Sequence, residues 1–375
     1  MKIIIIAGAR PNFMKIAPLI RAIEKYNDYL PTGKEGIEYI LVHTGQHYDI
    51  EMSEVFFRDL DLPKPDVNLE VGSGSHAVQT ANILIRFEEV CLREKPYWVL
   101  VVGDVNSTMA CALVAAKLGI KVGHVEAGLR SYDRTMPEEL NRVVTDALAD
   151  LLFTPSPDAD ENLIREGVTV ERIKYVGNIM IDTLIVQLEK ARQRKTYEKF
   201  GLTEKAYALV TLHRPANIDD INSLLCIMNT LKDITQRIPI IFPVHPRTKK
   251  KLAELGFTGR PVENGVVKLI NPLGYHDFIS IVEKAQFVLT DSGGLQEETT
   301  FLGIPCLTLR PNTERPITIK QGTNMLTSLQ NLKKDVDLIL SGKQKKGIIP
   351  ARWDGLTGQR IIDILANESK PHPIC

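Results

Sequence analysis

Short apolar segments recur along the chain and alternate with longer amphipathic stretches. The apolar segments are 3–6, 39–42, 99–102, 151–153, 208–212, 238–244, 266–270 and 287–289. Strands that are buried on both faces have this nearly unbroken apolar character, as in parallel sheets. The amphipathic stretches are long enough for crossover helices, and they are 12–26, 76–94, 105–118, 137–149, 218–236 and 275–285. The alternation of strand and helix predicts an α/β fold.

The alternation pauses near 179–205, where a helical pattern runs into a charged stretch before strands resume. A chain of 375 residues is long enough for two domains with full cores. We therefore predict two doubly wound Rossmann-like domains that face a central cleft. The first is 1–177 and the second is 178–356, with a final helix in about 357–375 that packs back on the first domain.

Composition narrows the classes of partner. The 46 Lys and Arg residues are matched by 46 Asp and Glu, so no overall basic field is available to hold nucleic acid or an anionic membrane surface. The five cysteines lie far apart, which predicts neither a disulfide framework nor a zinc site. No apolar run reaches the roughly 18 residues of a membrane span, and the run at the N-terminus is too short for a signal peptide. We expect a cytoplasmic protein.

Ligands of open α/β sheets bind beyond the carboxyl ends of the strands, so the loops that follow the apolar segments carry the candidate chemistry. Arg10 and Lys15 follow the first strand at the start of a helix, where two cations and free N–H groups suit an anionic ligand or merely a solvated helix start. Asp104, in GDVNST, either points into the cleft or caps the next helix.

The stretch 124–142 contributes two further carboxylates. Glu126 ends a buried strand, where an acidic residue needs a partner or a function. Glu138 follows Pro137 in the first turn of a helix, and the helix dipole there stabilises an anion. Asp104, Glu126 and Glu138 can therefore converge on one side of the cleft, although Glu138 could simply be favourable helix design.

In the second half, His213 and Arg214 follow a strand, and His245 and Arg247 repeat the pattern. An adjacent cation disfavours protonation of a histidine, so His213 suits a neutral acid/base or a phosphate-facing donor. A lone histidine is more often structural.

The strongest local signal is TDSGGLQEE at 290–298. Ser292, Gly293 and Gly294 allow close approach of the backbone and open a helix, whose N–H groups can hold phosphate. Glu298 lies one turn deeper on the same helix face and could accept hydrogen bonds from a ribose diol. A nucleoside diphosphate fits both features, and a glycine-rich cap with solvated glutamates is the alternative.

Two motifs point elsewhere and are rejected. GSGSHA at 72–77 matches a dinucleotide-binding pattern, but a polar segment precedes it. The D-x-D patterns at 59–61 and 158–160 are short enough to occur by chance. We predict neither NAD nor a metal ion as cofactor.

Taken together and in order, the motifs resemble the non-hydrolysing UDP-N-acetylglucosamine 2-epimerase family, whose members share the two-domain GT-B fold. The motifs are GARPNFMKIAP, TGQHYD, GDVNST, HVEAGLR, PEELNR, VGN, HR at 213–214, PVHPRT, PLGYHDF, DSGGLQEE and TERP, and they cover nearly the whole chain.

The resemblance implies a role for each matching residue. Ser292, Gly293 and Gly294 would hold the diphosphate and Glu298 the ribose. Further substrate contacts would come from Arg10, Lys15, Phe278 (beside the uracil) and Arg315. The implied catalytic group is Asp104, Glu126, Glu138 and His213. Family members are homodimers, so the resemblance also implies a homodimer.

The implied activity is the reversible conversion of UDP-N-acetylglucosamine to UDP-N-acetylmannosamine. The hydrogen at C2 of the sugar is not adjacent to a carbonyl, so a path through elimination of UDP to a 2-acetamidoglucal and re-addition is expected, with carboxylates on both faces of C2. The alternatives are a hydrolysing epimerase that releases UDP and ManNAc, an epimerase of a 2,3-diacetamido uronic acid UDP-sugar, a GT-B glycosyltransferase and a non-catalytic UDP-sugar binding protein.

The chain departs from many family members in the residues after His213-Arg214, where Pro215-Ala216-Asn217 stand, and at Tyr48-Asp49 and Asn82. In bacterial members these regions build a second UDP-GlcNAc site that activates the enzyme. The sequence leaves open whether UDP-GlcNAc activates this protein in that way.

Overall fold

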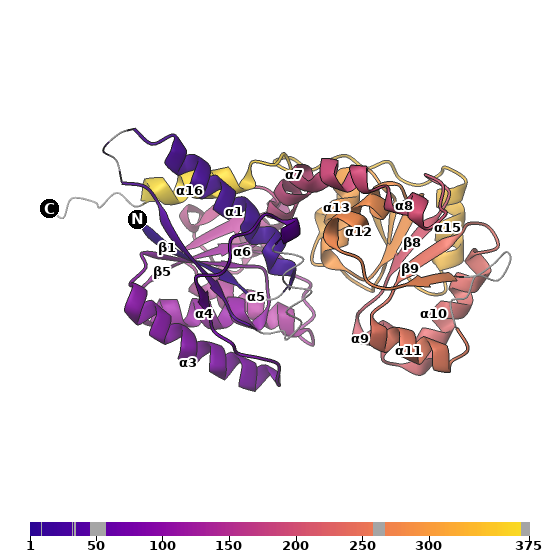
Figure 1. Ribbon diagram of the computed structural model, residues 1–375, viewed down its shortest axis with the longest axis horizontal. Coiled ribbons are helices and arrows are strands. Elements are labelled where there is room, and N and C mark those ends of the chain that lie inside the picture. Colours follow the sequence, from indigo (N-terminus) through magenta and orange to yellow (C-terminus); the bar gives the residue numbers. More distant parts are fainter. Residues whose placement is uncertain (9, 32, 34, 46–57, 258–266, 369–375) are drawn as a thin grey trace. The chain divides into compact units, whose positions relative to one another are not determined.

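The computed structural model describes residues 1–8, 10–31, 33, 35–45, 58–257 and 267–368, apart from the side chains of residues 10, 11, 215, 216, 246 and 247. The chain divides into two compact units. Unit 1 comprises 1–186 and 351–375, and unit 2 comprises 187–350. Figure 1 shows one sheet flanked by helices in each unit.

Unit 1 contains a parallel sheet of seven strands in the order β3-β2-β1-β4-β5-β6-β7. Its strands are β1 (Lys2–Ala7), β2 (Glu38–His43), β3 (Val67–Asn68), β4 (Trp98–Val102), β5 (Lys121–Val125), β6 (Leu151–Thr154) and β7 (Ile173–Tyr175). Its helices are α1 (Arg10–Asp28), α3 (His76–Glu94), α4 (Asn106–Lys117), α5 (Pro137–Leu148), α6 (Pro157–Arg165), the first half of α7 (Ile179–Arg194), α16 (Thr357–Glu368) and a 3₁₀ turn at Val170–Arg172. The chain reverses its direction of travel across the sheet at β1, as in doubly wound folds.

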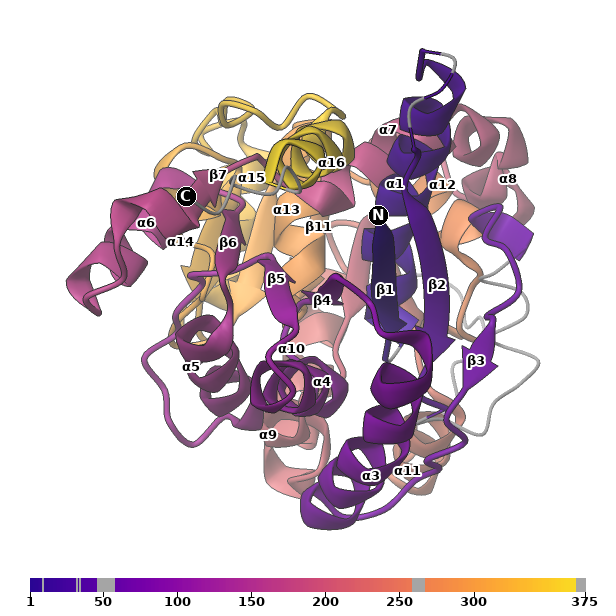
Figure 2. The same cartoon turned by 90° about the vertical axis from the view of Figure 1, so that its left-hand side faces the viewer.

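Helices cover both faces of this sheet, so its central strands have no solvent face. Helices α3, α4 and α5 lie on one face, and α1 and α16 lie on the other (Figure 2). Alternate residues of β1 divide between these layers: Ile4 and Ile6 belong to the cluster that contains Phe87 of α3. Burial on both faces explains why the strands read as unbroken apolar segments.

Unit 2 contains a parallel sheet of six strands in the order β10-β9-β8-β11-β12-β13. Its strands are β8 (Ala208–Thr211), β9 (Ile240–Pro243), β10 (Val267–Ile270), β11 (Phe287–Thr290), β12 (Cys306–Leu309) and β13 (Asn324–Thr327). Its helices are α8 (Thr196–Lys199), α9 (Pro215–Ile218), α10 (Ile221–Ile234), α11 (Pro246–Glu254), α12 (Tyr275–Glu283), α13 (Gly293–Leu302), α14 (Pro316–Lys320) and α15 (Leu332–Leu340).

The two faces of this sheet also have separate apolar cores. Ala208 and Val210 pack with residues of α10 and α15 on one face. Leu209 lies between them in sequence and packs with residues of α12 and α13 on the other face. The period of two along the strand thus assigns alternate side chains to opposite helix layers. The predicted fold class, α/β with two doubly wound parallel sheets, is confirmed.

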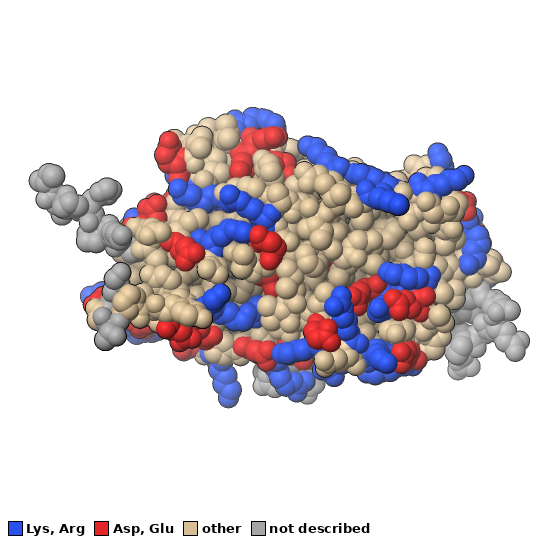
Figure 3. Space-filling view, turned by 90° about the horizontal axis from the view of Figure 1, so that it is seen from above, with Lys and Arg blue, Asp and Glu red and all other residues tan. Residues whose placement is uncertain are grey.

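The surface carries charges of both signs, as the equal numbers of acidic and basic residues lead us to expect. On the face drawn in Figure 3, acidic and basic side chains are interspersed on both units. Within the described ranges, no helix combines the length and the apolar character that a membrane span requires. The described cysteines are all free thiols, and Cys375 lies outside the described residues.

Candidate functional site

The carboxyl ends of β4 and β5 place Asp104 and Glu126 at the same edge of the first sheet. These strands are neighbours, and Val102 pairs with Val125 in the register of the sheet. Asp104 follows Val102 by two residues, and Glu126 follows Val125 directly. Two acidic side chains from distant parts of the sequence are thereby brought to the edge where ligands of doubly wound sheets bind.

Glu126 is a buried carboxylate held in an unusual backbone conformation. Its exposed fraction is 7%, and its φ of 73° lies in the left-handed region that residues other than glycine rarely occupy. Lys15 of α1 forms an ion pair with its Oε2 atom. A Cβ atom at Gly103 would lie 2.7 Å from Lys15 Nζ, so this close packing requires glycine there. Such strain is retained where the surrounding structure fixes the residue, and it concentrates at functional sites.

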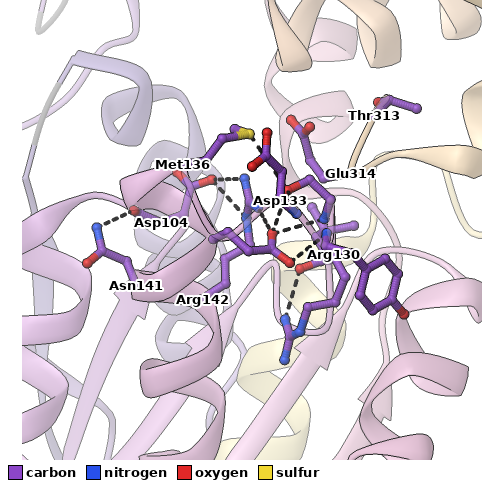
Figure 4. Close-up of polar contacts among 12 residues, drawn as sticks. Asp104, Arg130, Asp133, Met136, Asn141, Arg142, Thr313 and Glu314 are labelled. Carbon is purple, nitrogen blue, oxygen red and sulfur yellow. Dashed lines mark hydrogen bonds and ion pairs between the residues drawn. The ribbon is translucent and has the colours of Figure 1, made fainter. Parts of the chain in front are cut away.

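Asp104 is held by helix α5. Arg142 donates to its Oδ2 atom from Nη2 at 2.7 Å and from Nε at 3.1 Å, and Asn141 Nδ2 donates to its backbone oxygen at 2.9 Å. Figure 4 shows these side chains directed from α5 toward Asp104. Helix α4 begins at Asn106 with Val105 as its N-cap, so the capping alternative for Asp104 is wrong. Arg142 was not singled out by the sequence, although it lies on the helix that carries Glu138.

The first turn of α5 carries two glutamates with different environments. The helix begins at Pro137 as predicted, and the side chain of Glu138 is exposed. Glu139 is 2% exposed and accepts hydrogen bonds from Ser131 N, Ser131 Oγ and Tyr132 N, each at 2.9 Å. The buried glutamate of the pair is therefore the one that sequence reasoning did not choose. Glu139 fixes the loop before the helix, whereas Glu138 is available to solvent.

In unit 2, the ends of β8 and β11 bring His213 to Asp291. Thr211 pairs with Thr290 across these strands. His213 Nδ1 lies 2.8 Å from Asp291 Oδ1, the imidazole is largely exposed and the carboxylate is fully buried. The adjacent Arg214 was the neighbour expected to act on the ring, but the group in contact with the ring is a carboxylate 78 residues further along the chain.

Asp291 is held ionised by several donors. It accepts hydrogen bonds from the backbone N–H groups of His213 and Arg214 and from Asn217 Nδ2 at 2.9 Å. Burial alone would raise the pKa of Asp291, but the hydrogen bonds and the charge of His213 outweigh it and lower that pKa. The only hint in the sequence was its position, immediately after a buried strand and before Ser292.

Ser292, Gly293 and Gly294 open helix α13 as predicted, with Ser292 at the N-cap. Arg315 lies beside them: a Cβ atom at Gly293 would contact Arg315 Nη1. The guanidinium forms ion pairs with Glu314 and, from Nε at 3.0 Å, with Glu297. The structure therefore places a helix N-terminus and a buried arginine together, an arrangement suited to a phosphate group.

Glu298 lies inside α13 and is 5% exposed. Burial, together with the neighbouring Glu297, raises its pKa from an ordinary 4.5 to about 8 against the hydrogen bond of Tyr275 Oη at 3.2 Å. Tyr275 was also missed by the sequence analysis. Phe278, one turn further along α12, is half-buried against the apolar cluster that contains Leu209 of β8.

Some predicted residues lie outside the described part of the structure. They are the side chains of Arg10 and Arg247 and residues 46–49 of the TGQHYD motif. His245, at the end of β9, is exposed. Among the described residues, no three His, Cys, Asp or Glu side chains are grouped in a way that could hold a metal ion.

Two doubly wound α/β units with polar groups at their strand ends define a protein of the GT-B-like class. The sequence model of a family described as UDP-N-acetylglucosamine 2-epimerase matches residues 32–366, and the chain belongs to that family. The resemblance drawn from the motifs is thus confirmed at the level of the family.

Relatives match over most of their length. The chain is 43% identical to a UDP-N-acetylglucosamine 2-epimerase of Methanococcus maripaludis, with 99% of this chain and 100% of that protein covered. It is 40% identical to a UDP-2,3-diacetamido-2,3-dideoxy-D-glucuronate 2-epimerase of Pseudomonas aeruginosa, with 87% and 88% covered. It matches the crystal structure of the Methanocaldococcus jannaschii UDP-GlcNAc 2-epimerase in complex with UDP-GlcNAc and UDP with a TM-score of 0.87 and 43% identity, covering 98% of this chain and 100% of that one.

Proposed function

We propose that this epimerase-family enzyme interconverts UDP-N-acetylglucosamine and UDP-N-acetylmannosamine at C2 without releasing the free sugar. The observation that carries the proposal is the pair Asp104 and Glu126, two acidic side chains at neighbouring strand ends, each with its own cationic partner. The Methanococcus relative bears the name of this activity, and the Methanocaldococcus structure contains UDP-GlcNAc and UDP. These are properties of the relatives that support the proposal.

The proposed reaction is an anti elimination followed by re-addition. A base removes the proton from C2, the C–H electron pair forms the C1=C2 bond, and the C1–O bond breaks so that UDP leaves with its electron pair. The intermediate is a 2-acetamidoglucal. A phosphate oxygen then attacks C1, while the C1=C2 electrons take up a proton at the opposite face of C2. The sum of these steps neither oxidises nor reduces the sugar, so the balance requires no redox partner.

Two acid/base groups on opposite faces of C2 satisfy this scheme, and Asp104 and Glu126 are our candidates. Arg142 forms an ion pair with Asp104, and Lys15 forms one with Glu126, so each carboxyl group is held in place by a cation. His213 is the proposed third participant, oriented by Asp291 as carboxylates orient catalytic imidazoles. Glu138 is a base or charge stabiliser in this proposal.

The nucleotide is assigned to unit 2. Ser292, Gly293 and Gly294 would donate to the diphosphate, with Arg315 supplying charge beside them. Glu298 would accept from the ribose diol, and Phe278 would lie by the uracil. Arg10, together with Lys15, would add positive charge near the departing UDP. Stabilisation of a leaving diphosphate by fixed donors is the kind of electrostatic effect that contributes most to such reactions.

The test is turnover of UDP-GlcNAc in D₂O, followed by proton NMR at C2 and phosphorus NMR of the nucleotide. We expect deuterium at C2 of both epimers, together with intact UDP-sugar. Full interconversion without label would overturn the elimination path. Irreversible accumulation of free UDP and ManNAc would show a hydrolysing epimerase, and transfer to an added acceptor with C2 unlabelled would show a glycosyltransferase.

Variants separate chemistry from binding. Asp104→Asn, Glu126→Gln and His213→Ala are expected to lower kcat by at least about 100-fold, the scale of a lost general acid or base, while UDP binding is kept. Glu89→Gln, an exposed residue of α3, is the matched control and should turn over normally. Parallel loss of UDP binding in all three variants would contradict the assignment.

A second substrate has specific support. The Pseudomonas relative is named for a 2,3-diacetamido glucuronate, which presents the same C2 hydrogen and leaving group with different substituents at C3 and C5. Comparison of kcat/KM for the two UDP-sugars decides between them. We propose UDP-GlcNAc as the better substrate, and a higher kcat/KM for the uronate would reverse this choice.

The family resemblance also leads us to propose a homodimer. Light scattering on the purified protein should then give a mass near twice 42.0 kDa. A mass of one chain across micromolar concentrations would contradict it.

A further inference from the structure

A fully buried histidine connects the loops that carry Asp104 and Glu126. His124 lies on β5, two residues before Glu126, and is 0% exposed. Its Nε2 atom lies 2.8 Å from the backbone oxygen of Gly103, the residue before Asp104. Its Nδ1 atom lies 2.6 Å from Asp146 Oδ1 on α5. One ring on β5 therefore connects this strand to the loop after β4 and to helix α5.

The partners of the ring determine its protons. A carbonyl oxygen can only accept, so Nε2 of His124 must carry a hydrogen. Asp146 also accepts from Gly128 N at 3.1 Å and forms an ion pair with Arg130 Nη1 at 2.7 Å, both through Oδ2. Burial of Asp146 opposes its ionisation, but His124 and Arg130 outweigh burial and lower the pKa of this carboxyl.

Arg130 and Gly128 N both contact Asp146 Oδ2, and an ion pair with arginine requires a carboxylate, so the hydrogen in the 2.6 Å contact between Asp146 Oδ1 and His124 Nδ1 belongs to the ring. A ring with hydrogens on both nitrogens is an imidazolium. The cluster of charges is then Asp146, His124, Arg130 and Glu166, and Arg130 donates to Glu166 from Nε at 2.8 Å and from Nη2 at 2.7 Å. Two cations and two anions compensate each other, which a buried charged group requires.

We propose that His124 is a positioning residue of the epimerase: a buried imidazolium that ties the Gly103–Asp104 loop to helix α5 and so fixes the two acidic side chains relative to each other. This inference rests on the proposed function for the roles of Asp104 and Glu126. Its geometric basis is independent of that function.

Helix α5 then holds the acidic loops at four points. Asn141 binds the backbone of Asp104, and Arg142 binds its side chain. Asp146 holds the loop after Glu126 through Gly128 N, and it holds Gly103 through His124. A neutral ring has one N–H group and could donate either to Gly103 O or to Asp146, but not to both. With hydrogens on both nitrogens, the ring links Gly103 to α5 through two hydrogen bonds.

The proton count is measured on the wild-type protein with ¹⁵N-labelled histidine. At pH 7, we expect the ring nitrogens of His124 to resonate together in the protonated range and each to show an attached hydrogen. Asp146→Asn removes the anion and should leave one ring nitrogen unprotonated. A neutral His124 ring in the wild-type protein would overturn the proposal. This measurement needs no substrate, so it does not depend on the reaction.

Kinetics test the positioning role. His124→Gln can donate a hydrogen bond to Gly103 but carries no charge. We expect kcat to fall about 10- to 100-fold, as for a small misplacement of reacting groups, with KM and the Kd for UDP within about threefold. Glu89→Gln, an exposed residue of α3, is again the control and should keep the wild-type kcat. Wild-type kcat in His124→Gln, or equal losses of kcat and UDP affinity in a folded variant, would overturn the role.

A failure of the proposed reaction and a failure of the positioning role give different results. Absence of C2 labelling in the wild-type enzyme would contradict the proposed reaction and leave the NMR result standing. Labelling in the wild-type enzyme with an unchanged His124→Gln would contradict only the positioning role. If His124→Gln does not fold, the wild-type NMR measurement still decides the charge on which the proposal depends.

Discussion

Glu298 is the residue at which charge and burial conflict most clearly. Its pKa in the folded protein is about 8, against 4.5 as an ordinary glutamate. Between these values the folded state holds a proton that the unfolded state has lost, so the free energy of unfolding falls as pH rises. The slope is about 1.4 kcal/mol for each pH unit in that window. Burial is the cause, because the carboxylate would be charged where water cannot reach it.

Glu298→Gln removes this proton linkage. Urea titrations at pH 5, 6, 7 and 8 should show the variant gaining stability relative to the wild-type protein at each step, while the difference is smallest at pH 5. The same variant should bind UDP more weakly if Glu298 accepts from the ribose. Glu254→Gln, at the end of α11, serves as a control and should track the wild-type protein. A constant difference across the pH range would contradict the raised pKa.

Gly293 is a second residue at which the structure predicts the effect of a substitution. A Cβ atom there would contact Arg315 Nη1 and would lie 2.6 Å from Glu314 Oε1. Gly293→Ala should therefore displace the guanidinium from the start of α13 and weaken UDP binding by at least about tenfold, the cost of one charge-assisted hydrogen bond. Isothermal titration with UDP measures this.

Gly201 provides the control for a glycine replacement. It has a φ of 67° and nothing within 4 Å of the Cβ position. Gly201→Ala should cost about 1 kcal/mol of stability from backbone strain and leave UDP binding unchanged. Equal UDP affinity in Gly293→Ala and the wild-type protein would show that Arg315 does not bind the nucleotide.

Among the elements, α16 depends on one close approach to α1. Gly358 lies in the first turn of α16, and a Cβ atom there would lie 2.7 Å from the backbone oxygen of Pro18. Pro18 is inside α1. Gly358→Ala should force the helices apart and lower the free energy of unfolding by about 1–3 kcal/mol, despite the better helix propensity of alanine.

Chemical denaturation measures this, with Asn367→Ala on the exposed side of α16 as the control. The control should be neutral or slightly stabilising. A Gly358→Ala protein as stable as the wild type would mean that α1 and α16 can separate without cost.

Elements were predictable where burial alone decides the pattern. The strands β1, β4 and β11 lie under helices on both faces, so Ile3–Ile6, Val99–Val102 and Phe287–Leu289 read as strands without further information. Strands β12 and β13 were not predicted, because Thr308 and Asn324 interrupt their apolar character. Those polar groups are satisfied by each other at 2.6 Å, a contact between residues 16 apart that no local pattern contains.

In the candidate site, too, local features could be predicted from the sequence, whereas contacts between distant residues could not. Asp104 and Glu126 could be chosen because a carboxylate after a buried strand is locally unusual. Their partners Arg142 and Lys15 lie 38 and 111 residues away, and Asp291 lies 78 residues from His213, so those pairs exist only once the strands are ordered in the sheet. Helix α7 runs through the boundary between the units without a change of pattern, which is why the sequence could mark the crossing only as a broad region.

For the whole molecule, the two units have separate apolar cores. The groups proposed to hold the diphosphate, the ribose and the uracil belong to unit 2, and unit 1 adds only the cations Arg10 and Lys15. A ligand that binds only the folded state stabilises it by RT ln(1 + [L]/Kd), about 2.7 kcal/mol at a concentration of 100 times Kd. UDP without the sugar should therefore protect the amides of unit 2, and within it the first turn of α13 and the segment 313–318 should gain most.

Hydrogen exchange with mass spectrometry separates the units in one experiment. Peptides from the β4 and β5 loops of unit 1 are the internal control, and inorganic phosphate at the same concentration is the ligand control. With UDP-GlcNAc in place of UDP, the peptides containing Asp104 and Glu126 should also gain protection, because the sugar is the part on which those groups would act. Protection by UDP that is confined to unit 1 would reverse the assignment of nucleotide and sugar to the two units, and equal protection by phosphate would remove the role of uridine in binding.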